Sequence, residues 1–397
     1  MTSTSLESVA QEQSSKVVVL RLLLLTLAVF IAFLVIGMQL PVLPLHLHHS
    51  LGMSTSVIGL VVGAQFIAAL CSRAWAGNLA DMRGAKWAMT LGLLLASLSG
   101  VVYLSSLAFT QVPFVSVWGL LIGRIVLALG ESLVVTGALG WGIGKVGPQN
   151  AGQVMAWNGM AMYGAYSLGA PLGVAINSAW GFAGVSLGSV LIPLLALLAI
   201  AHIKGVSTTA TRRTPFYRVI GAVWVPGLGL ALCSVGFGVI TAFIALLFSA
   251  RDWGDSSLVF SAFGLAFITA RLFCSHLPDR LGGARVAMVC VAIEALGLLM
   301  IWGAEGTPTV YIGAALTGIG YSLAFPGFGV EAVRRAPPQT RALAMGAYVA
   351  FLDIALGLTS PLAGLMAQSW GVASVYLAGA ASVGLSFFVA LQLLSKR

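Results

Sequence analysis

The chain has few charged side chains for its length. Asp, Glu, Lys and Arg make up 8% of the 397 residues, whereas hydrophobic residues make up 59%. A soluble domain carries about 25% charged residues, so this scarcity excludes an ordinary soluble fold. The apolar runs reach the roughly 20 residues that a helix needs to cross a bilayer. They do not alternate in polarity as barrel strands do, so we predict spanning helices.

Motifs of enzymes and nucleotide-driven pumps are missing. No histidine sits in an H-E-x-x-H pattern, and no G-x-x-x-x-G-K-[ST] pattern occurs. We therefore expect no enzyme activity and no cofactor, with energy drawn from a gradient, a partner or the substrate. A histidine cluster before position 50 is either a solvated loop or a metal site; we favour the loop and expect no metal. The cysteines, which have no metal-ligand or disulfide spacing, are Cys71, Cys233, Cys274 and Cys290.

Twelve apolar segments predict an all-α integral membrane fold. Their approximate limits are 18–45, 54–77, 86–107, 114–139, 151–176, 181–203, 219–248, 256–276, 285–303, 308–331, 340–367 and 371–394. Residues 1–17 are polar and lack the basic start of a signal peptide, so we expect a disordered cytoplasmic tail.

Basic residues indicate the orientation. If the N-terminus lies inside, most of the 20 Lys and Arg residues fall in inside segments, and Arg251 alone falls in an outside connection. This bias predicts cytoplasmic termini and, for a bacterial chain, the inner membrane. The net charge of +9 is spread over short connections without an aromatic-basic stripe, so we expect no nucleic-acid partner. The expected partners are the lipid bilayer, protons and a small-molecule substrate, bound by a monomer.

A charged turn between two apolar segments, Gly77–Lys86, is echoed later in the chain. Residues of the first half recur a fixed number of positions later. At an offset of 198 residues, Asp81 pairs with Asp279 and Arg73 with Arg271. At an offset of 190 residues, the pairs are Gly130 with Gly320, Trp180 with Trp370 and Gly181 with Gly371. The repeat predicts two pseudo-symmetric six-helix bundles, 18–203 and 219–394, joined by a cytoplasmic linker at 204–218.

Charged residues inside spans are expensive and mark functional positions. Arg124 and Glu131 lie seven residues apart, on one face of the fourth span. Either Glu131 carries a proton while Arg124 modulates it or binds an anion, or the two form a fixed ion pair. Asp353 in the eleventh span could contact Arg73 across the seam between the halves, as a gate, or each could have local partners. For Glu294 we expect a polar neighbour within its own half.

Other polar and small residues outline a cavity. Its candidate lining residues, which could equally pack within the bundle, are Gln39, Trp157, Asn158 and Tyr163. Gly169, Pro171 and Gly173 form a G-x-P-x-G pattern that predicts close helix packing and a bend.

The turn Gly77–Lys86 fits G-x-L-A-D-x-x-G-x-K, the first motif of the major facilitator superfamily, which the chain resembles over nearly its whole length. Arg124 with Gly130 resembles the family's span-4 motif, and 169–173 its span-5 antiporter motif. The segments 154–159, 234–240 and 352–357 are most similar to the bacterial YhhS/YfcJ-like branch, regarded as exporters of small organic compounds. The resemblance implies that Asp81 holds an inner gate closed and that Arg124 serves proton coupling. With the residues that the repeat adds, the candidate gating residues are Gly77, Asp81, Arg83, Gly84, Lys86, Arg73, Asp279 and Arg271.

These observations together predict a secondary active transporter. The first hypothesis is proton-coupled export of a small organic or amphipathic compound, such as a drug, sugar or metabolite, by rocking of two halves. Coupling would fall to Glu131, Arg124 and Asp353. The alternatives are a proton symporter that imports a sugar or organic acid, and a membrane receptor or scaffold that moves no solute.

Overall fold

The computed structural model describes residues 3–147, 151–206, 217–335 and 341–395, without the side chains of 3–21, 151–152, 217–219, 222, 279 and 341–343. Within these ranges the fold is all-α and has no strand, as the sequence predicts. The helices are α1 (Ser3–Leu45), α2 (Thr55–Arg83), α3 (Ala85–Ser106), α4 (Pro113–Val146), α5 (Ala151–Ala201), α6 (Tyr217–Ala250), α7 (Ser257–Cys274), α8 (Leu277–Leu281), α9 (Gly283–Trp302), α10 (Thr307–Arg335), α11 (Arg341–Trp370) and α12 (Ser374–Ser395), with a short π-helix η1 (His46–Ser50) and a 3₁₀ turn η2 (Leu107–Phe109).

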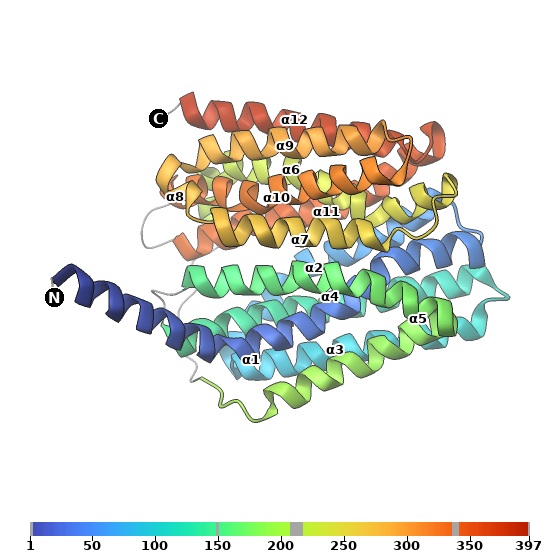
Figure 1. Cartoon of the computed structure of the whole chain (residues 1–397). Coiled ribbons are helices and arrows are strands. Elements are labelled where there is room, and N and C mark those ends of the chain that lie inside the picture. The colour runs from blue at the N-terminus through green and yellow to red at the C-terminus, as the bar shows by residue number, and fades with distance from the viewer. Residues whose placement is uncertain (1–2, 148–150, 207–216, 336–340, 396–397) are drawn as a thin grey trace.

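Eleven helices in the described ranges are long and apolar enough to cross a membrane. One of them, α5, has 51 residues, far more than one crossing needs, and its backbone leaves helical geometry at Gly181 (φ 62°). Met38 of α1 packs against both Gly173 and Gly188, one on each side of this break. The chain therefore doubles back within α5 (Figure 1). Counting both arms gives the twelve predicted crossings, with the start of α1 and the end of α12 at the same end of the molecule.

The N-terminal segment differs from the expectation. Helix α1 begins at Ser3, where the sequence predicts a disordered tail through residue 17. Residues 3–17 contain no glycine or proline to stop a helix, so the hydrogen-bond ladder of the first span runs on into them. Most of the predicted linker lies outside the described residues, because α5 ends at Ala201 and α6 starts at Tyr217.

The sequence repeat returns as repeated helix packing. In the first half, a Cβ added at Gly130 would lie 2.7 Å from the carbonyl oxygen of Gly92, so α3 and α4 touch backbone to backbone. In the second half, Gly320 meets the carbonyl oxygen of Cys290 in the same way, at 2.4 Å, between α9 and α10. Residues 92 and 290 are related by the 198 offset, and 130 and 320 by the 190 offset. Small residues therefore define the same close helix crossing twice.

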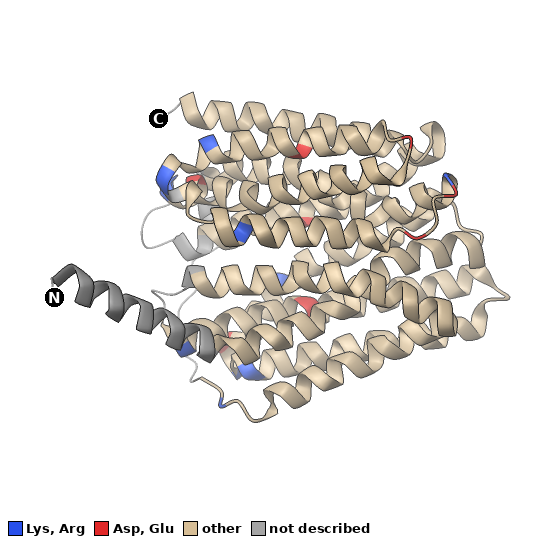
Figure 2. Cartoon of the chain, in the orientation of Figure 1, with Lys and Arg blue, Asp and Glu red and all other residues tan. Residues whose placement is uncertain are grey.

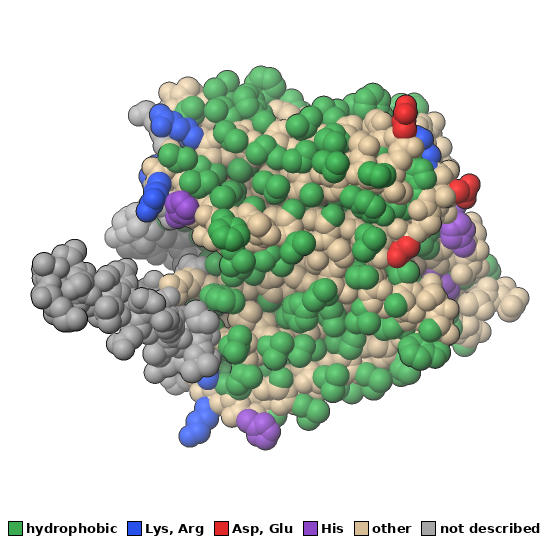
Figure 3. All heavy atoms as spheres, viewed as in Figure 1, with side chains coloured by type: hydrophobic (Ala, Val, Ile, Leu, Met, Phe, Trp, Pro, Cys, Tyr) green, Lys and Arg blue, Asp and Glu red, His purple; other side chains and the backbone are tan. Residues whose placement is uncertain are grey.

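Charge separates the two ends of the molecule. Most Lys and Arg of the described connections gather at the end that holds both helix termini, whereas acidic loop residues and one basic segment lie at the opposite end (Figure 2). Between the ends, the visible surface is densely covered by hydrophobic side chains (Figure 3). This apolar waist is the surface that a bilayer would contact.

Several direct hydrogen bonds between the halves lie toward the end opposite the termini. Thr55, at the start of α2, donates to the carbonyl oxygen of Gly364 on α11 at 2.9 Å. Ser261 of α7 donates to the carbonyl oxygen of Ser167 on α5 at 2.7 Å. His49 lies 2.9 Å from the hydroxyl of Ser249, where η1 meets the end of α6. The seam is therefore closed at this end by pairs from α2–α11, α5–α7 and η1–α6.

Candidate functional site

A polar relay runs through the middle of the first half. Arg124 of α4 is 2% exposed, and its Nη1 donates to Oε1 of Gln65 on α2 at 2.5 Å. The Nε2 of Gln65 donates in turn to Glu131 at 2.8 Å. On the other side, Gln39 of α1 lies 3.4 Å from Arg124 and donates to Ser189 of α5 at 3.0 Å. We call Gln39, Gln65, Arg124, Glu131 and Ser189 the polar relay.

The relay settles how Arg124 and Glu131 are connected in this conformation. They share a face of α4, as their spacing predicts, and the amide of Gln65 bridges them. One atom of the guanidinium, Nε, has no partner among the described residues, and Tyr103 lies within electrostatic range of the guanidinium. A buried donor without a partner is costly, so this region holds unused hydrogen-bonding capacity.

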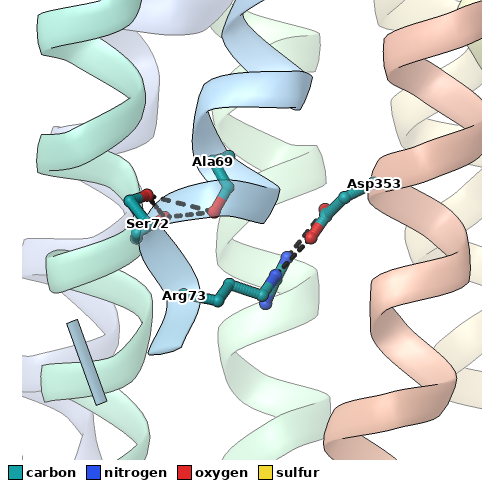
Figure 4. Close-up of polar contacts among 5 residues, drawn as sticks. Ala69, Ser72, Arg73 and Asp353 are labelled. Atoms are coloured by element: carbon teal, nitrogen blue, oxygen red, sulfur yellow. Dashed lines mark hydrogen bonds and ion pairs between the residues drawn. The ribbon is translucent and has the colours of Figure 1, made fainter. Parts of the chain in front are cut away.

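An ion pair joins the two halves beside the relay. Arg73 of α2 makes a two-pronged contact with Asp353 of α11, through Nε and, at 2.7 Å, through Nη2 (Figure 4). The contact that the sequence left open is therefore formed. Ser72, one residue earlier, donates to the carbonyl oxygen of Ala69 at 3.0 Å. The side chains of Ser72 and Arg73 point to opposite sides of α2, and that of Arg73 points toward Asp353 (Figure 4). Glu131 lies within electrostatic range of Arg73, Arg124 and Asp353, so the ion pair and the relay form one charged group.

An aromatic cluster fills the seam on the side of the second half. Its members are Tyr163 and Tyr166 of α5, Phe237 of α6, Phe263 and Phe267 of α7, and Tyr321 of α10. Tyr163 stacks on Phe267 with ring centroids 3.9 Å apart, and Phe237 stacks on Tyr321 at 5.6 Å. Tyr163 and Tyr166 belong to the first half and the other four rings to the second. The aromatic cluster is therefore shared by both halves, as a site between rocking halves would be.

The predicted cavity residues are split among three environments. Gln39 belongs to the polar relay and Tyr163 to the aromatic cluster. Asn158 is buried, and its Nδ2 has no partner among the described residues. Trp157 packs against the apolar cluster that contains Leu22 and Val154.

The charged turn lies at the end that carries the termini. Gly84, between α2 and α3, has φ 98°, and Gly282, its partner at the 198 offset, has φ 93°. Lys86 donates to the carbonyl oxygens of Ala201 and Ile203, each at 2.8 Å, which ties this turn to the end of α5. Of the other predicted gating residues, Gly77 is buried, Asp81 is exposed and Arg83 lies over the ring of Trp87, whereas the side chain of Asp279 is outside the described residues.

The G-x-P-x-G pattern serves close packing. Gly169 lies against the backbone of Gly37, and Gly173 against that of Met38, so α1 and α5 approach closely. Helix α5 keeps helical backbone angles across Pro171, and the residue with non-helical angles is Gly181.

Two features escaped the sequence analysis. Gln65 is uncharged, yet it connects the two charges of α4; its signal was a lone amide within an apolar run. The aromatic cluster gathers rings that are far apart in the chain. The repeat offered a signal for one of them, because Phe263 is related by the 198 offset to Gln65 of the polar relay. Glu294 differs from expectation: it is fully buried, and neither of its oxygens has a partner among the described residues.

Paired helical bundles around a charged, aromatic seam define a multi-pass membrane transporter. The family model described as Major Facilitator Superfamily matches residues 25–254 and 227–397, so the chain belongs to that superfamily. An uncharacterized MFS-type transporter of Salmonella typhimurium is 44% identical over 89% of this chain and 91% of its own length.

Solved structures agree on the fold. The nucleoside transporter NupG superposes with a TM-score of 0.73 at 16% identity, covering 94% of this chain and 98% of that one. A D-xylose-proton symporter superposes with a TM-score of 0.73 at 15% identity, covering 92% and 97%. At these identities the likeness concerns architecture alone. The relatives are named as transporters, and the chain is not an enzyme.

Proposed function

We propose that this transporter couples the export of a small organic compound to the entry of protons. The two halves rock about the seam, and Glu131 binds a proton in one conformation and releases it in the other. The observation that carries the proposal is the charged group at the seam: Glu131 is held by Gln65, within electrostatic range of an ion pair that joins the halves.

The physical reason lies in the cost of charge within a bilayer. A buried carboxylate is tolerated when partners compensate its charge, and protonation removes that need. Separation of the halves would break the contact between Arg73 and Asp353 and so change the field at Glu131. Proton binding at Glu131 and opening of the seam would thereby be linked, which is the requirement for coupled transport.

We place both termini in the cytoplasm and the chain in the inner membrane of a bacterium. The end with both helix termini also carries most of the described Lys and Arg residues of the connections (Figure 2). The positive-inside rule assigns such an end to the cytoplasm. The closed seam at the opposite end then makes this conformation sealed toward the outside.

Transport in proteoliposomes tests the coupling. Vesicles with an imposed pH gradient and no other energy source should drive substrate against its gradient in the wild type, and Glu131→Gln should abolish this while retaining substrate exchange without a gradient. Full gradient-driven transport by Glu131→Gln would refute the proposal. Glu305→Gln changes an exposed glutamate in the connection between α9 and α10, so it is the matched control and should behave as the wild type.

The same vesicles decide the direction and the class. Substrate that moves with the proton flux, instead of against it, would indicate a symporter that imports a sugar or organic acid. Binding without any transmembrane movement would indicate a receptor. Both outcomes contradict the proposed antiport.

A further inference from the structure

Arg271 of α7 is the second-half counterpart of Arg73, at the 198 offset, yet its surroundings differ. Arg73 meets the carboxylate of Asp353. At the 190 offset, the residue that corresponds to Asp353 is Tyr163, which has a phenol in place of a carboxylate. The repeat therefore keeps the cation in both halves and the anion in one.

The contacts of Arg271 leave its charge uncompensated. Its Nη1 donates to the carbonyl oxygen of Ser322 at 2.6 Å, and its guanidinium carbon lies 5.8 Å from the ring centroid of Phe267. Among the described residues, no carboxylate lies within ion-pair distance of it. A cation without a counter-ion at membrane depth is expensive, so its retention needs a ligand or a function to explain it.

A glycine of the first half lies next to the guanidinium of Arg271. On α5, a Cβ added at Gly159 would lie 3.8 Å from Nη2 of Arg271 and would meet no other described side chain within 4 Å. No side chain of this residue therefore covers the cation. The ring of Phe267, which lies beside the guanidinium, stacks on Tyr163 of α5.

We propose that Arg271, Phe267 and Tyr163 form a subsite for a planar aromatic anion, whose carboxylate binds the guanidinium and whose ring stacks within the aromatic cluster. The planar fork of arginine matches a carboxylate with two parallel hydrogen bonds, and aromatic rings prefer stacked or edge contacts with other rings. The anion supplies the charge that Asp353 supplies to Arg73. This inference rests on the proposed transport function and names the class of its substrate.

Binding to the purified full-length protein tests the subsite without any transport. Calorimetric titration compares 2-naphthoate, decalin-2-carboxylate (charge kept, flat ring lost) and 2-naphthylmethanol (ring kept, charge lost). We expect 2-naphthoate to bind at least about tenfold more tightly than either analogue, because each lacks one interaction worth about 1.4 kcal/mol or more. Equal binding of the three compounds, or no binding of 2-naphthoate, would overturn the proposal.

Variants locate the site. Arg271→Gln should weaken 2-naphthoate about 10- to 100-fold and remove the preference over the alcohol, since a charged hydrogen bond is lost. Arg271→Lys, which keeps the charge without the fork, should fall between. Arg285→Gln, which changes an exposed residue of α9, is the control for these arginine variants. Unchanged binding by Arg271→Gln would overturn the assignment.

The aromatic contact is tested separately. Phe267→Leu should weaken the binding of 2-naphthoate more than that of decalin-2-carboxylate. Phe273→Leu, at a position that is 73% exposed on the same helix, should change the binding of neither compound.

The two proposals fail separately. Glu131→Gln should retain 2-naphthoate binding while losing gradient-driven transport. Normal 2-naphthoate selectivity in a protein without proton coupling would refute the transport mechanism and leave the subsite standing. Proton-coupled transport by a protein that ignores the aromatic ring and the carboxylate would do the reverse.

Discussion

The two halves carry the same helices but opposite chemistry at the seam. Positions related by the 198 and 190 offsets are Gln39 and Phe237, Gln65 and Phe263, and Glu131 and Tyr321. The first of each pair belongs to the polar relay and the second to the aromatic cluster. At these three positions the first half carries polar or charged side chains, and the second half carries aromatic ones.

The packing positions behave differently from these seam positions. Gly130 and Gly320 keep the same backbone contact in both halves. Where helices touch within a half, a side chain has no room, so the repeat is retained. At the positions of the polar relay and the aromatic cluster a side chain has room, and there the two repeats differ. Division of labour between the halves follows from that difference, and four experiments test it.

The largest effect is expected from replacing the bridge of the relay. Gln65→Leu leaves Arg124 and Glu131 buried without their shared partner, at a cost of about 3–5 kcal/mol. We expect a clearly lowered thermal unfolding temperature and loss of gradient-driven transport. Phe263→Leu, at the repeat-related position, should alter substrate affinity and leave proton coupling intact. Equal loss of coupling in both variants would contradict the division between the halves.

The shared packing predicts matched responses in stability. Gly130→Ala and Gly320→Ala each push a Cβ against a backbone carbonyl, so each should destabilise the protein by about 1–3 kcal/mol, measured by thermal unfolding in detergent. Gly140→Ala is the control, because its added Cβ would meet its nearest atom at 3.5 Å. A tolerated substitution in one half and a damaging one in the other would show that the packing is not equivalent.

Exchange of the charges at the seam should have a smaller effect, because the side chain of Arg73 is 36% exposed. Asp353→Asn should slow transport about tenfold, a loss of roughly 1.4 kcal/mol. Asp353→Arg combined with Arg73→Asp should recover part of the rate, as measured by initial uptake into vesicles. No recovery would mean that each residue acts through other partners.

The smallest effect is expected at the charged turn. Asp81 is exposed at the end of α2, far along the helix from the relay. Asp81→Asn should slow turnover a few-fold, within about 1 kcal/mol, and leave substrate affinity unchanged. Altered substrate preference in this variant would place the turn in the binding site and break its separation from the seam.

Much of the architecture is readable from the chain, because long apolar runs, charge bias and the repeat are local or periodic signals. The shared face of Arg124 and Glu131 also follows from helix geometry. Other features depend on how helices meet. Gln65 becomes a bridge only because α2 brings its amide between two residues of α4. Trp157 points to an apolar cluster because the neighbouring turns of α1 and α4 pack there, which its own sequence context does not reveal. The roles of the site residues in transport stay predictions.

The Trp–Gly dipeptides end the first arm of α5 and the whole of α11, with φ 62° at Gly181 and 82° at Gly371. Such angles suit glycine, so the turn resists other residues at both places. These tight corners leave little slack chain between consecutive spans. We therefore expect the two spans of each pair to move together when the member that faces the other half is displaced. A flexible insertion at either corner would let the two spans of that pair move independently.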